Sequence, residues 1–245
     1  MKFWTILSIF ATTLIVTAPV NAQLYSEDFT GDDGASILTL GWAAHSSVPD
    51  ADMFVTSTDE NMGPSEAIDN ATITGSQSGW TRFYYPFTSA VTSGPIFLEA
   101  DVNLESGNQQ FGFAGGSPNP ENRGAFVRAT GGTGMLLANM TEGNQDSGLG
   151  GYARIRIDVD LNTNASTLTV TGLEGQGNAT VSGTWDGGAG AGVTGLYLSA
   201  DIRNLAASGI AVDNIVVGVP EPASGMLAAA GLLGLALCWS RRRRR

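Results

Sequence analysis

The sequence predicts an all-β protein, an antiparallel β-sandwich of the jelly-roll type, flanked by two apolar terminal segments. Residues 96–104 and 154–161 carry most of this prediction, because apolar and polar residues alternate along both stretches. A period of two with one apolar face is typical of a half-buried strand in an antiparallel sheet. The central region shows no long helical period, and the 33 glycines of the chain suit tight turns between short strands.

Weaker strand signals follow one another along the rest of the central region. They lie at residues 53–56, 81–87, 110–114, 125–129, 135–139, 166–171, 179–185 and 210–217, whereas residues 196–202 form a third alternating set like 96–104 and 154–161. Glycine-rich turn clusters such as residues 131–134 and 186–188 separate them. We expect about eleven strands in all, with at most one helical turn, at residues 65–68.

Residues 1–22 have the three parts of a secretory signal peptide. Lys2 gives a positive start, residues 3–16 form an apolar run, and small residues precede Gln23. We therefore expect signal peptidase to cleave between Ala22 and Gln23. The alternative is an uncleaved membrane helix, for which the apolar run is short.

Residues 219–245 combine a proline-rich triplet, an apolar segment and a positive end. Pro220-Glu221-Pro222 stands before an uncharged stretch that predicts a transmembrane helix at about residues 223–240. Such a helix would be about 25 Å long, near the lower limit for crossing a bilayer. The last five residues are Arg241, Arg242, Arg243, Arg244 and Arg245. An arginine cluster stays in the cytoplasm, so residues 23–218 would form a domain outside the cell.

This tail resembles the PEP-CTERM sorting signal, which has the same three parts in the same order. The resemblance implies cleavage near the Pro-Glu-Pro triplet by an exosortase-type membrane protease, followed by delivery to the cell surface or the extracellular matrix. The protein would then be anchored in the membrane only before processing. The alternative is an ordinary single-pass anchor that is never cut.

The exterior domain is strongly acidic and contains no cysteine. Between residues 23 and 218 stand six arginines and 22 aspartates and glutamates, which give a net charge of −16. A surface of this charge opposes the binding of nucleic acid. The one cysteine of the chain, Cys238, lies in the C-terminal apolar stretch, so the domain has neither a disulfide nor a thiolate metal site.

The two ends of the exterior domain resemble those of concanavalin A-like (laminin G-like) jelly rolls. The opening Tyr25-Ser26-Glu27-Asp28-Phe29 and the closing residues 212–217 carry the resemblance, together with the predicted hairpin at residues 155–170. In that architecture the first and last strands lie near each other. The resemblance implies recognition of carbohydrate or protein, but a fold alone does not determine a function.

Residues 99–105 contain the acidic residues that most suggest catalysis. Retaining glycosidases need two carboxylates about 5 Å apart. Glu99 and Glu105 are six residues apart in sequence, which separates them by about 20 Å in a regular strand. We therefore predict no catalytic residues and a structural acidic strand. Its outward side chains would face Arg154 and Arg156 if the two strands are neighbours.

Acidic, histidine and aromatic side chains elsewhere in the domain could in principle bind a metal ion or a sugar. Glu27 or Asp28 near Asp213 would suit calcium, but Asp213-Asn214 is expected to cap a turn before the last strand, so no metal or other cofactor is predicted. His45 is the only histidine and is expected in an ordinary loop. The aromatic residues suited to stacking on sugars, though more typical of a core, are Trp42, Trp80, Tyr84, Tyr85 and Trp185.

The sequence as a whole predicts a non-enzymatic exported protein of the cell surface or extracellular matrix. Its expected partners are signal peptidase, the exosortase-type protease and an extracellular polysaccharide bound by the jelly roll. Two alternatives stay open: a purely structural matrix component with no ligand, and a divergent glycoside hydrolase.

Overall fold

The computed structural model describes ten segments of the 245-residue chain. They are residues 22–44, 52–56, 67–72, 80–104, 109–115, 123–130, 134–173, 175–185, 192–201 and 210–220. Gln23–Val219 forms one compact unit. The predicted signal peptide and the predicted helix at about residues 223–240 lie outside the described segments, and within those segments no helix combines the length and apolar character needed to cross a bilayer.

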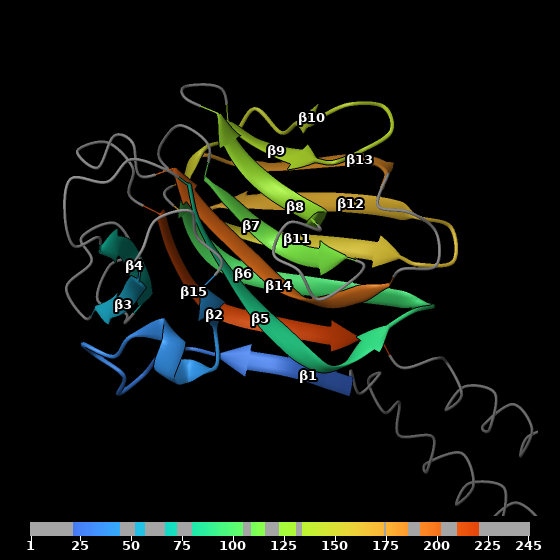
Figure 1. Ribbon diagram of the computed structural model, residues 1–245. Helices are drawn as coiled ribbons and strands as arrows, with labels where there is room; N and C mark the ends of the chain where they lie inside the picture. Colours follow the sequence, from blue (N-terminus) through green and yellow to red (C-terminus); the bar gives the residue numbers. More distant parts are fainter. Residues whose placement is uncertain are drawn as a thin grey trace, which may run out of the picture. The chain divides into compact units, whose positions relative to one another are not determined.

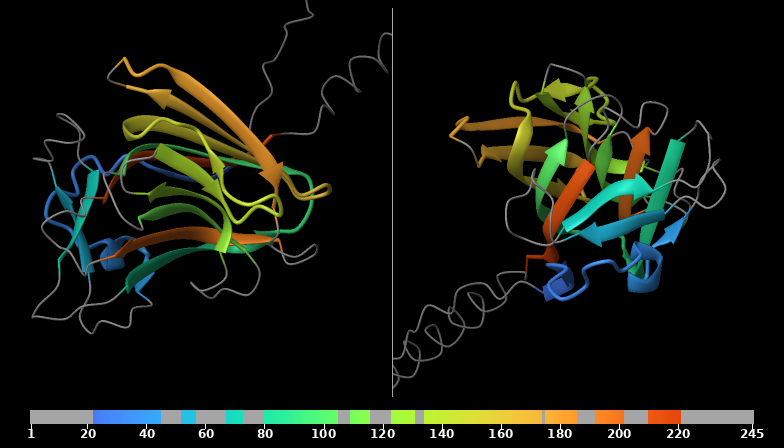
Figure 2. Two further views of the ribbon diagram at one scale, coloured as in Figure 1. Left: turned by 90° about the horizontal axis from the view of Figure 1, so that it is seen from above. Right: turned by 90° about the vertical axis from the view of Figure 1, so that its left-hand side faces the viewer.

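Two antiparallel sheets lie face to face in this unit, as the two layers of strands in Figure 2 show (Figures 1 and 2). Sheet A contains, in spatial order, β13 (Asn178–Thr184), β12 (Ala165–Gly172), β11 (Gly151–Asp160), β6 (Pro95–Leu104), β15 (Ile210–Val219), β4 (Ala67–Thr72) and β3 (Asp52–Thr56), and β1 (Ala22–Glu27) also pairs with β15. Sheet B contains β10 (Gln145–Asp146), β9 (Gly134–Ala138), β8 (Arg123–Thr130), β7 (Gln110–Gly115), β14 (Val193–Asp201), β5 (Trp80–Val91) and β2 (Ala43–Ala44). The predicted antiparallel sandwich is confirmed.

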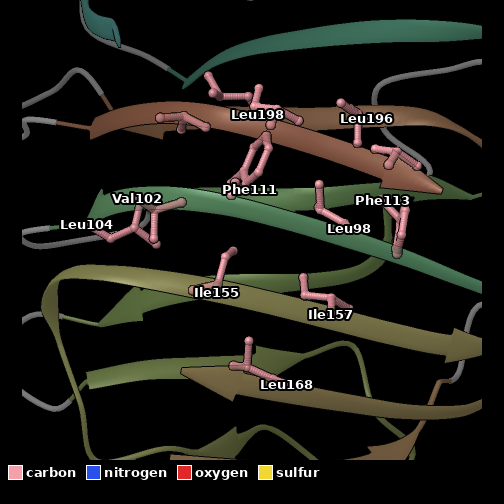
Figure 3. Packing of buried hydrophobic residues seen from close by; sticks show 14 of the residues in the cluster. Leu98, Val102, Leu104, Phe111, Phe113, Ile155, Ile157, Leu168, Leu196 and Leu198 are labelled. Atoms are coloured by element: carbon pink, nitrogen blue, oxygen red, sulfur yellow. The ribbon is translucent and has the colours of Figure 1, made fainter. Parts of the chain in front are cut away.

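The alternating residues of β6 and β11 form the centre of the core. Leu98 and Val102 of β6 are fully buried, and so are Ile155 and Ile157 of the neighbouring β11. Phe111 and Phe113 of β7 and Leu196 and Leu198 of β14 face them from sheet B (Figure 3). Burial of this apolar surface is the main force that holds the two sheets together.

The strand signals of the sequence fall in strands. At residues 65–68 the sequence allowed at most one helical turn. The structure describes residues 67 and 68 of this range, and both are in β4 (Ala67–Thr72), which pairs with β3 and β15. The sequence Ala-Ile-Asp-Asn-Ala-Thr has no clear alternation, so its pairing partners rather than its own pattern determine its conformation.

One edge of sheet A is closed by the segment after β1. The short 3-10 helix η1 (Ile37–Leu40) begins after the N-cap Ser36, whose Oγ accepts a hydrogen bond from the amide of Leu38. Just before it, the amide of Gly34 donates to the carbonyl of Val55, and the amide of Val55 donates to the carbonyl of Ala35. The edge strand β3 is therefore paired on its open side as well.

The first and last strands lie together, as expected for the jelly roll. β1 pairs with β15, and β15 also pairs with β6 along most of its length. The register between β15 and β6 shifts after Asp213, where Asn214 adopts a φ of 50°. Asp213-Asn214 thus forms a bulge inside β15, and the expectation of a turn before the last strand is wrong. The bulge lets Val212, Ile215 and Val217 all face the core.

Candidate functional sites on the two outer faces

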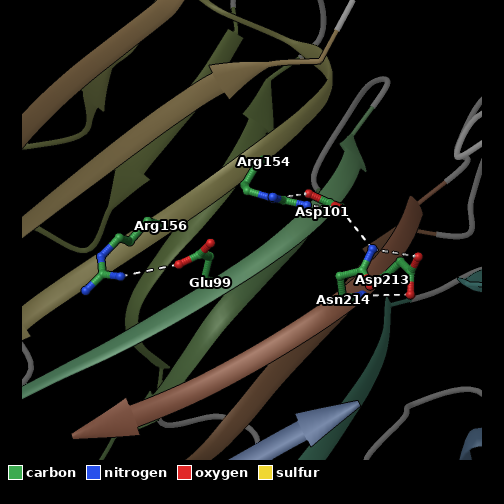
Figure 4. A network of polar contacts seen from close by, with 6 residues as sticks. All are labelled: Glu99, Asp101, Arg154, Arg156, Asp213 and Asn214. Atoms are coloured by element: carbon green, nitrogen blue, oxygen red, sulfur yellow. Dashed lines mark hydrogen bonds and ion pairs between the residues drawn. The ribbon is translucent and has the colours of Figure 1, made fainter. Parts of the chain in front are cut away.

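The outer face of sheet A carries an ionic cluster where β11, β6 and β15 lie side by side (Figure 4). We use this name for the six residues Glu99, Asp101, Arg154, Arg156, Asp213 and Asn214. The register places Arg154 opposite Asp101 and Arg156 opposite Glu99, so the predicted charge pairing between these two strands is confirmed.

Asp101 is the most buried acid of this cluster on β6, and its carboxylate is held from two sides. Arg154 donates from Nε to Oδ1 at 2.7 Å and from Nη2 to Oδ2 at 2.8 Å, a bidentate arrangement. Asn214 donates from Nδ2 to Oδ2 at 2.9 Å. Asp101 is 3% exposed, whereas the side chain of Arg154 is 48% exposed. The hydrogen bond with Asp101 is the main reason that the pKa of Arg154 is raised.

The bulge in β15 brings a second buried acid next to Asp101. Asp213 is 1% exposed and stands opposite Asp101 in the register of β15 and β6. Asn214 donates to it from the backbone amide (2.6 Å to Oδ1) and from Nδ2 (3.1 Å to Oδ2). The side-chain amide of Asn214 therefore lies between the carboxylates of Asp101 and Asp213, which would otherwise repel each other.

Arg156 is the centre of the half of the cluster whose acids are only partly buried. Its Nη1 lies 3.3 Å from Oε2 of Glu99, and its Nη2 lies 2.9 Å from Oδ1 of Asp158. Its guanidinium carbon also lies 4.2 Å above the centre of the Phe97 ring. The hydrogen bond with Asp158 is the main reason that the pKa of Arg156 is raised. These exposed contacts contribute little individually, at most about 1 kcal/mol each.

The ionic cluster holds the strands of sheet A together and does not have the geometry of a glycosidase site. Both carboxylates at its buried end already accept hydrogen bonds from Arg154 and Asn214. Glu105, the second glutamate weighed as a catalytic group, lies outside the described residues, as does His45. Among the described residues there is no group of three or more His, Cys, Asp or Glu that could hold a metal ion. Glu27 and Asp28 accept hydrogen bonds from nearby backbone amides.

The outer face of sheet B carries a different arrangement, a polar row beside an aromatic pair. The polar row is formed by Arg82 on β5, Ser199 on β14 and Gln110 on β7, which stand directly opposite one another in the register. The register also places Arg128 of β8 opposite Gln110. Two residues further along each strand, Tyr84 stands opposite Tyr197.

Two side chains of the polar row are buried without a hydrogen-bond partner. Ser199 is 0% exposed and Gln110 is 2% exposed, although both lie on an outer face. Neither Oγ of Ser199 nor Oε1 of Gln110 takes part in a hydrogen bond. Leaving a buried polar group unpaired costs about 1–3 kcal/mol, so this row is less stable than its burial suggests. Buried polar groups in folded proteins are usually hydrogen-bonded, so an unpaired one calls for an explanation, and a bound ligand is one explanation.

Tyr84 is fixed in place beside this row. Its hydroxyl donates to the carbonyl of Thr194 at 2.8 Å. Its ring lies against Gly195, where an added Cβ would come within 2.7 Å of the ring. Only a glycine at this position allows the ring to lie so close to the strand. Tyr84, Ala114 and Tyr197 form a small apolar cluster of their own on this face.

The other aromatic residues considered for sugar stacking belong to the core. Trp42 and Trp185 are buried, and the half-buried Tyr85 packs against Tyr25 and Trp42. The side chain of Trp80 lies outside the described residues. Of the five candidates, Tyr84 thus lies on the outer face of sheet B, and its neighbour Tyr197 was not singled out from the sequence.

The residues expected to take part in processing lie at the two ends of the compact unit. Ala22 and Gln23 are the first two residues of β1, and both are exposed. β15 ends at Val219, and Pro220 follows it directly. Glu221, Pro222 and the five terminal arginines lie outside the described residues.

Comparison with solved structures shows the class of this domain, a lectin-like β-sandwich. It resembles the carbohydrate esterase of the Shiga toxin-encoding bacteriophage phi24B, with a TM-score of 0.53, 16% identity and coverage of 82% of this chain and 100% of that one. It also resembles lectin UEA-II, solved with galactose (TM-score 0.52, 8% identity, 80% and 97% coverage). A seed lectin of Lotus tetragonolobus gives a TM-score of 0.50 at 12% identity, with 83% and 100% coverage. At these identities the likeness shows the fold alone.

The sequence comparison identifies the C-terminal tail. Residues 218–244 match the PEP-CTERM protein-sorting motif, so the resemblance of the tail is confirmed. The match begins at Gly218, inside β15. No match to a curated protein sequence was found.

Proposed function

We propose that this protein is exported, sorted by an exosortase-type protease, and displayed at the cell surface or in the extracellular matrix. The sorting motif at residues 218–244 carries this proposal. In the order of events that we propose, signal peptidase removes residues 1–22. The domain of residues 23–218 then folds outside the cell. The tail, residues 219–245, holds it there through a helix at about residues 223–240, with the arginines in the cytoplasm. Cleavage near Pro220-Glu221-Pro222 releases the domain from this transient anchor.

Mass spectrometry of the protein recovered from the cell exterior tests the processing steps. We expect an N-terminus at Gln23 and a C-terminus between Val219 and Pro222. Replacing all five terminal arginines by glutamine should reduce retention before cleavage, because these charges set the membrane orientation. Mature protein that still ends at Arg245 would leave only the ordinary membrane anchor.

We further propose that the domain binds an extracellular polysaccharide on the outer face of sheet B. The unpaired Ser199 and Gln110 support this proposal, because sugar hydroxyls are the partners that these two groups lack. Tyr84 and Tyr197, which are buried like the two polar groups (5% and 0% exposed), lie beside them, and Arg82 supplies a guanidinium. The fold shared with a lectin solved with galactose is consistent with this assignment. Since both polar atoms are buried, binding requires this face to open.

The substitution Ser199→Ala separates a binding role from a structural role. It removes a buried hydroxyl that has no partner, so we expect the free energy of unfolding to rise or stay unchanged. Binding on a polysaccharide array should weaken by about tenfold if a sugar takes over that hydrogen bond, which corresponds to about 1.4 kcal/mol. Hydrogen exchange of β7 and β14 should change when the polysaccharide binds.

Ser166→Ala is the matched control, because Oγ of Ser166 is also buried and unpaired but lies on β12 of sheet A. It should leave polysaccharide binding intact. If both variants bind as the parent does, the outer face of sheet B is not the binding site. If the parent binds no member of the array, the purely structural reading replaces the proposal.

A divergent glycoside hydrolase is the remaining alternative, and Glu99→Gln tests it. We expect no hydrolysis of β-glucans, galactans or marine polysaccharides by the parent, because the partner of Glu99 is Arg156 rather than a second carboxylate. Turnover by the parent that Glu99→Gln abolishes would make the domain an enzyme.

A further inference from the structure

The two edges of sheet A differ in how their backbone is used. β3, at one edge, exchanges hydrogen bonds with residues 34–35 on its open side. β13, at the other edge, pairs with β12 and, within the described residues, with no other strand. The open side of β13 is therefore the free edge of this sheet, and we ask what its backbone groups and side chains could bind.

The hydrogen bonds at both ends of β13 show which of its residues point to the open side. The pair next to its start is joined by Gly172 N to Gly177 O, and the pair next to its end by Trp185 N to Asn164 O. In an antiparallel pair, such hydrogen-bonded positions alternate with positions whose backbone groups point away. The positions whose backbone groups point away from β12 are therefore Asn178, Thr180, Ser182 and Thr184.

Thr184 confirms this direction, because its outward groups are already in use. Its carbonyl accepts from the amide of Thr141, and its amide donates to Oε2 of Glu142 at 2.8 Å. The loop after β9 thus forms the hydrogen bonds of the last outward-pointing position of β13. Asn178, Thr180 and Ser182 lie beyond it, each with one amide and one carbonyl directed away from β12.

The side chains of β13 lack the features that protect a free edge. Natural edge strands carry lysine, proline or inward charges that prevent pairing with another strand. β13 reads Asn-Ala-Thr-Val-Ser-Gly-Thr, and Glu174 is the single charged residue between positions 161 and 185. Asn178, Thr180 and Ser182 are exposed, and Ala179 and Val181 are half-buried on the inner face.

We infer that β13 is the contact surface for a second copy of this chain. The two β13 strands pair antiparallel across a two-fold axis at Thr180, which joins the two A sheets into one continuous sheet. Thr180 stands opposite Thr180 of the other copy, and Asn178 stands opposite Ser182. Every outward amide and carbonyl of these three positions then has a partner, and each Val181 is covered by Ala179 of the other copy.

The charge of the domain favours this edge over other surfaces as the place where two copies meet. A net charge of −16 makes copies repel each other, and the repulsion is smallest where a surface carries no charge. A symmetric contact also needs only one patch that matches itself, which an edge strand provides through its backbone. The contact is small, so we expect weak association that depends on a high local concentration.

Cysteine cross-linking in the full-length chain tests both the surface and its register. In a Cys238→Ser background, Thr180→Cys places the only cysteine of the chain on the two-fold axis. The two Cα atoms would lie about 5.5 Å apart, within the range that a disulfide spans. We expect mild oxidation to give a covalent dimer on a non-reducing gel.

Two controls use the same edge and the same face. Asn178→Cys alone should not cross-link, because the two copies of this position are about 13 Å apart, whereas a mixture of Asn178→Cys and Ser182→Cys chains should. Thr169→Cys lies opposite Thr180 on β12, one strand away from the edge, and should stay monomeric. Equal cross-linking by Thr169→Cys, or none by Thr180→Cys, would overturn the inference.

A charge substitution gives an independent readout. In sedimentation experiments, the mass of the parent should increase with concentration. Thr180→Glu places two negative charges opposite each other on the axis, so it should abolish this increase. Thr169→Glu adds the same charge beyond the screening length of about 10 Å at 0.1 M salt and should have no such effect. Matching thermal melts of the two variants show that both are folded. Self-association of Thr180→Glu equal to that of the parent would contradict the pairing.

Discussion

Asp101 shows at the scale of single residues how this fold tolerates buried charge on an outer face. Its carboxylate is nearly inaccessible, and three hydrogen bonds from Arg154 and Asn214 replace the water that it lacks. Arg154 itself is half exposed, so only one partner of the pair bears most of the desolvation cost. Removing Arg154 should therefore lower the free energy of unfolding by more than is usual for a half-exposed side chain.

Arg154→Met should lower the free energy of unfolding by about 2 kcal/mol, because it leaves Asp101 buried with one hydrogen-bond donor. Arg156→Met makes the same change where the partners, Glu99 and Asp158, are only partly buried, and should cost less than about 1 kcal/mol. Urea unfolding of the two variants measures the difference. Equal losses would mean that Asp101 does not depend on Arg154.

Glu142 should make the domain sensitive to acid. Its carboxylate accepts hydrogen bonds from the amide and the hydroxyl of Thr184, and these bonds hold its pKa below the ordinary value. A lowered pKa in the folded state means that the stabilisation is present above the pKa of the unfolded chain and is lost as the pH falls through the folded value. Glu142→Gln should therefore be less stable than the parent at pH 7, and the difference should shrink as the pH falls below the pKa that Glu142 has in the unfolded chain. A constant difference between the two melting temperatures at all pH values would contradict this.

The bulge in β15 is the feature at the scale of elements that shapes the ionic cluster. If the same sequence continued as a regular strand through Asn214, the apolar side chains of Ile215 and Val217 would point outward. Asn214 suits the position twice, because asparagine tolerates a positive φ and its amide bonds to both Asp101 and Asp213.

Asn214→Gly and Asn214→Ala separate these two contributions. Glycine accepts the φ of 50° but loses the side-chain hydrogen bonds, whereas alanine loses both advantages. We expect alanine to be less stable than glycine by about 1 kcal/mol, the cost of the left-handed conformation. Thermal denaturation of both variants gives this difference. An alanine variant as stable as the glycine variant would show that the bulge relaxes.

Strands in which apolar and polar residues alternate could be predicted from the sequence, and some strands without this alternation could not. The sequence alternates over residues 98–104 of β6 and 153–160 of β11, so the positions, the inner faces and the opposed charges of these strands could be predicted, whereas the burial of Asp101 on the outer face could not. β4 carries no such pattern, and the bulge at Asn214 breaks the pattern of β15 at the point that matters most. Local periodicity reports burial, but it does not report register.

The whole molecule divides into one compact unit and two terminal segments, so the unit should fold by itself. Residues 23–219 expressed alone should give a β-rich circular dichroism spectrum and one cooperative melt. Reducing agent should not shift the melting temperature, because the one cysteine of the chain lies at position 238. A largely helical spectrum or a melt that responds to dithiothreitol would contradict this prediction.

The candidate polysaccharide site could not be predicted, because it exists only at the scale of the folded molecule. Arg82, Gln110 and Ser199 come from β5, β7 and β14, and nothing in the sequence around each of them indicates a site. The sorting motif is the opposite case, since all its parts are contiguous in the chain. Sequence therefore predicted where the protein goes more completely than what it binds.

The direct junction between β15 and the tail has a mechanical consequence. A pull on the tail, whether from flow or from a neighbouring cell, acts on Pro220 and is passed at once to Val219. β15 is flanked by β6 on one side and by β1 and β4 on the other, so a pull along the strand strains many hydrogen bonds in shear rather than opening them one by one. The strand that continues into the tail is thus an inner strand of sheet A, paired with neighbours on both sides.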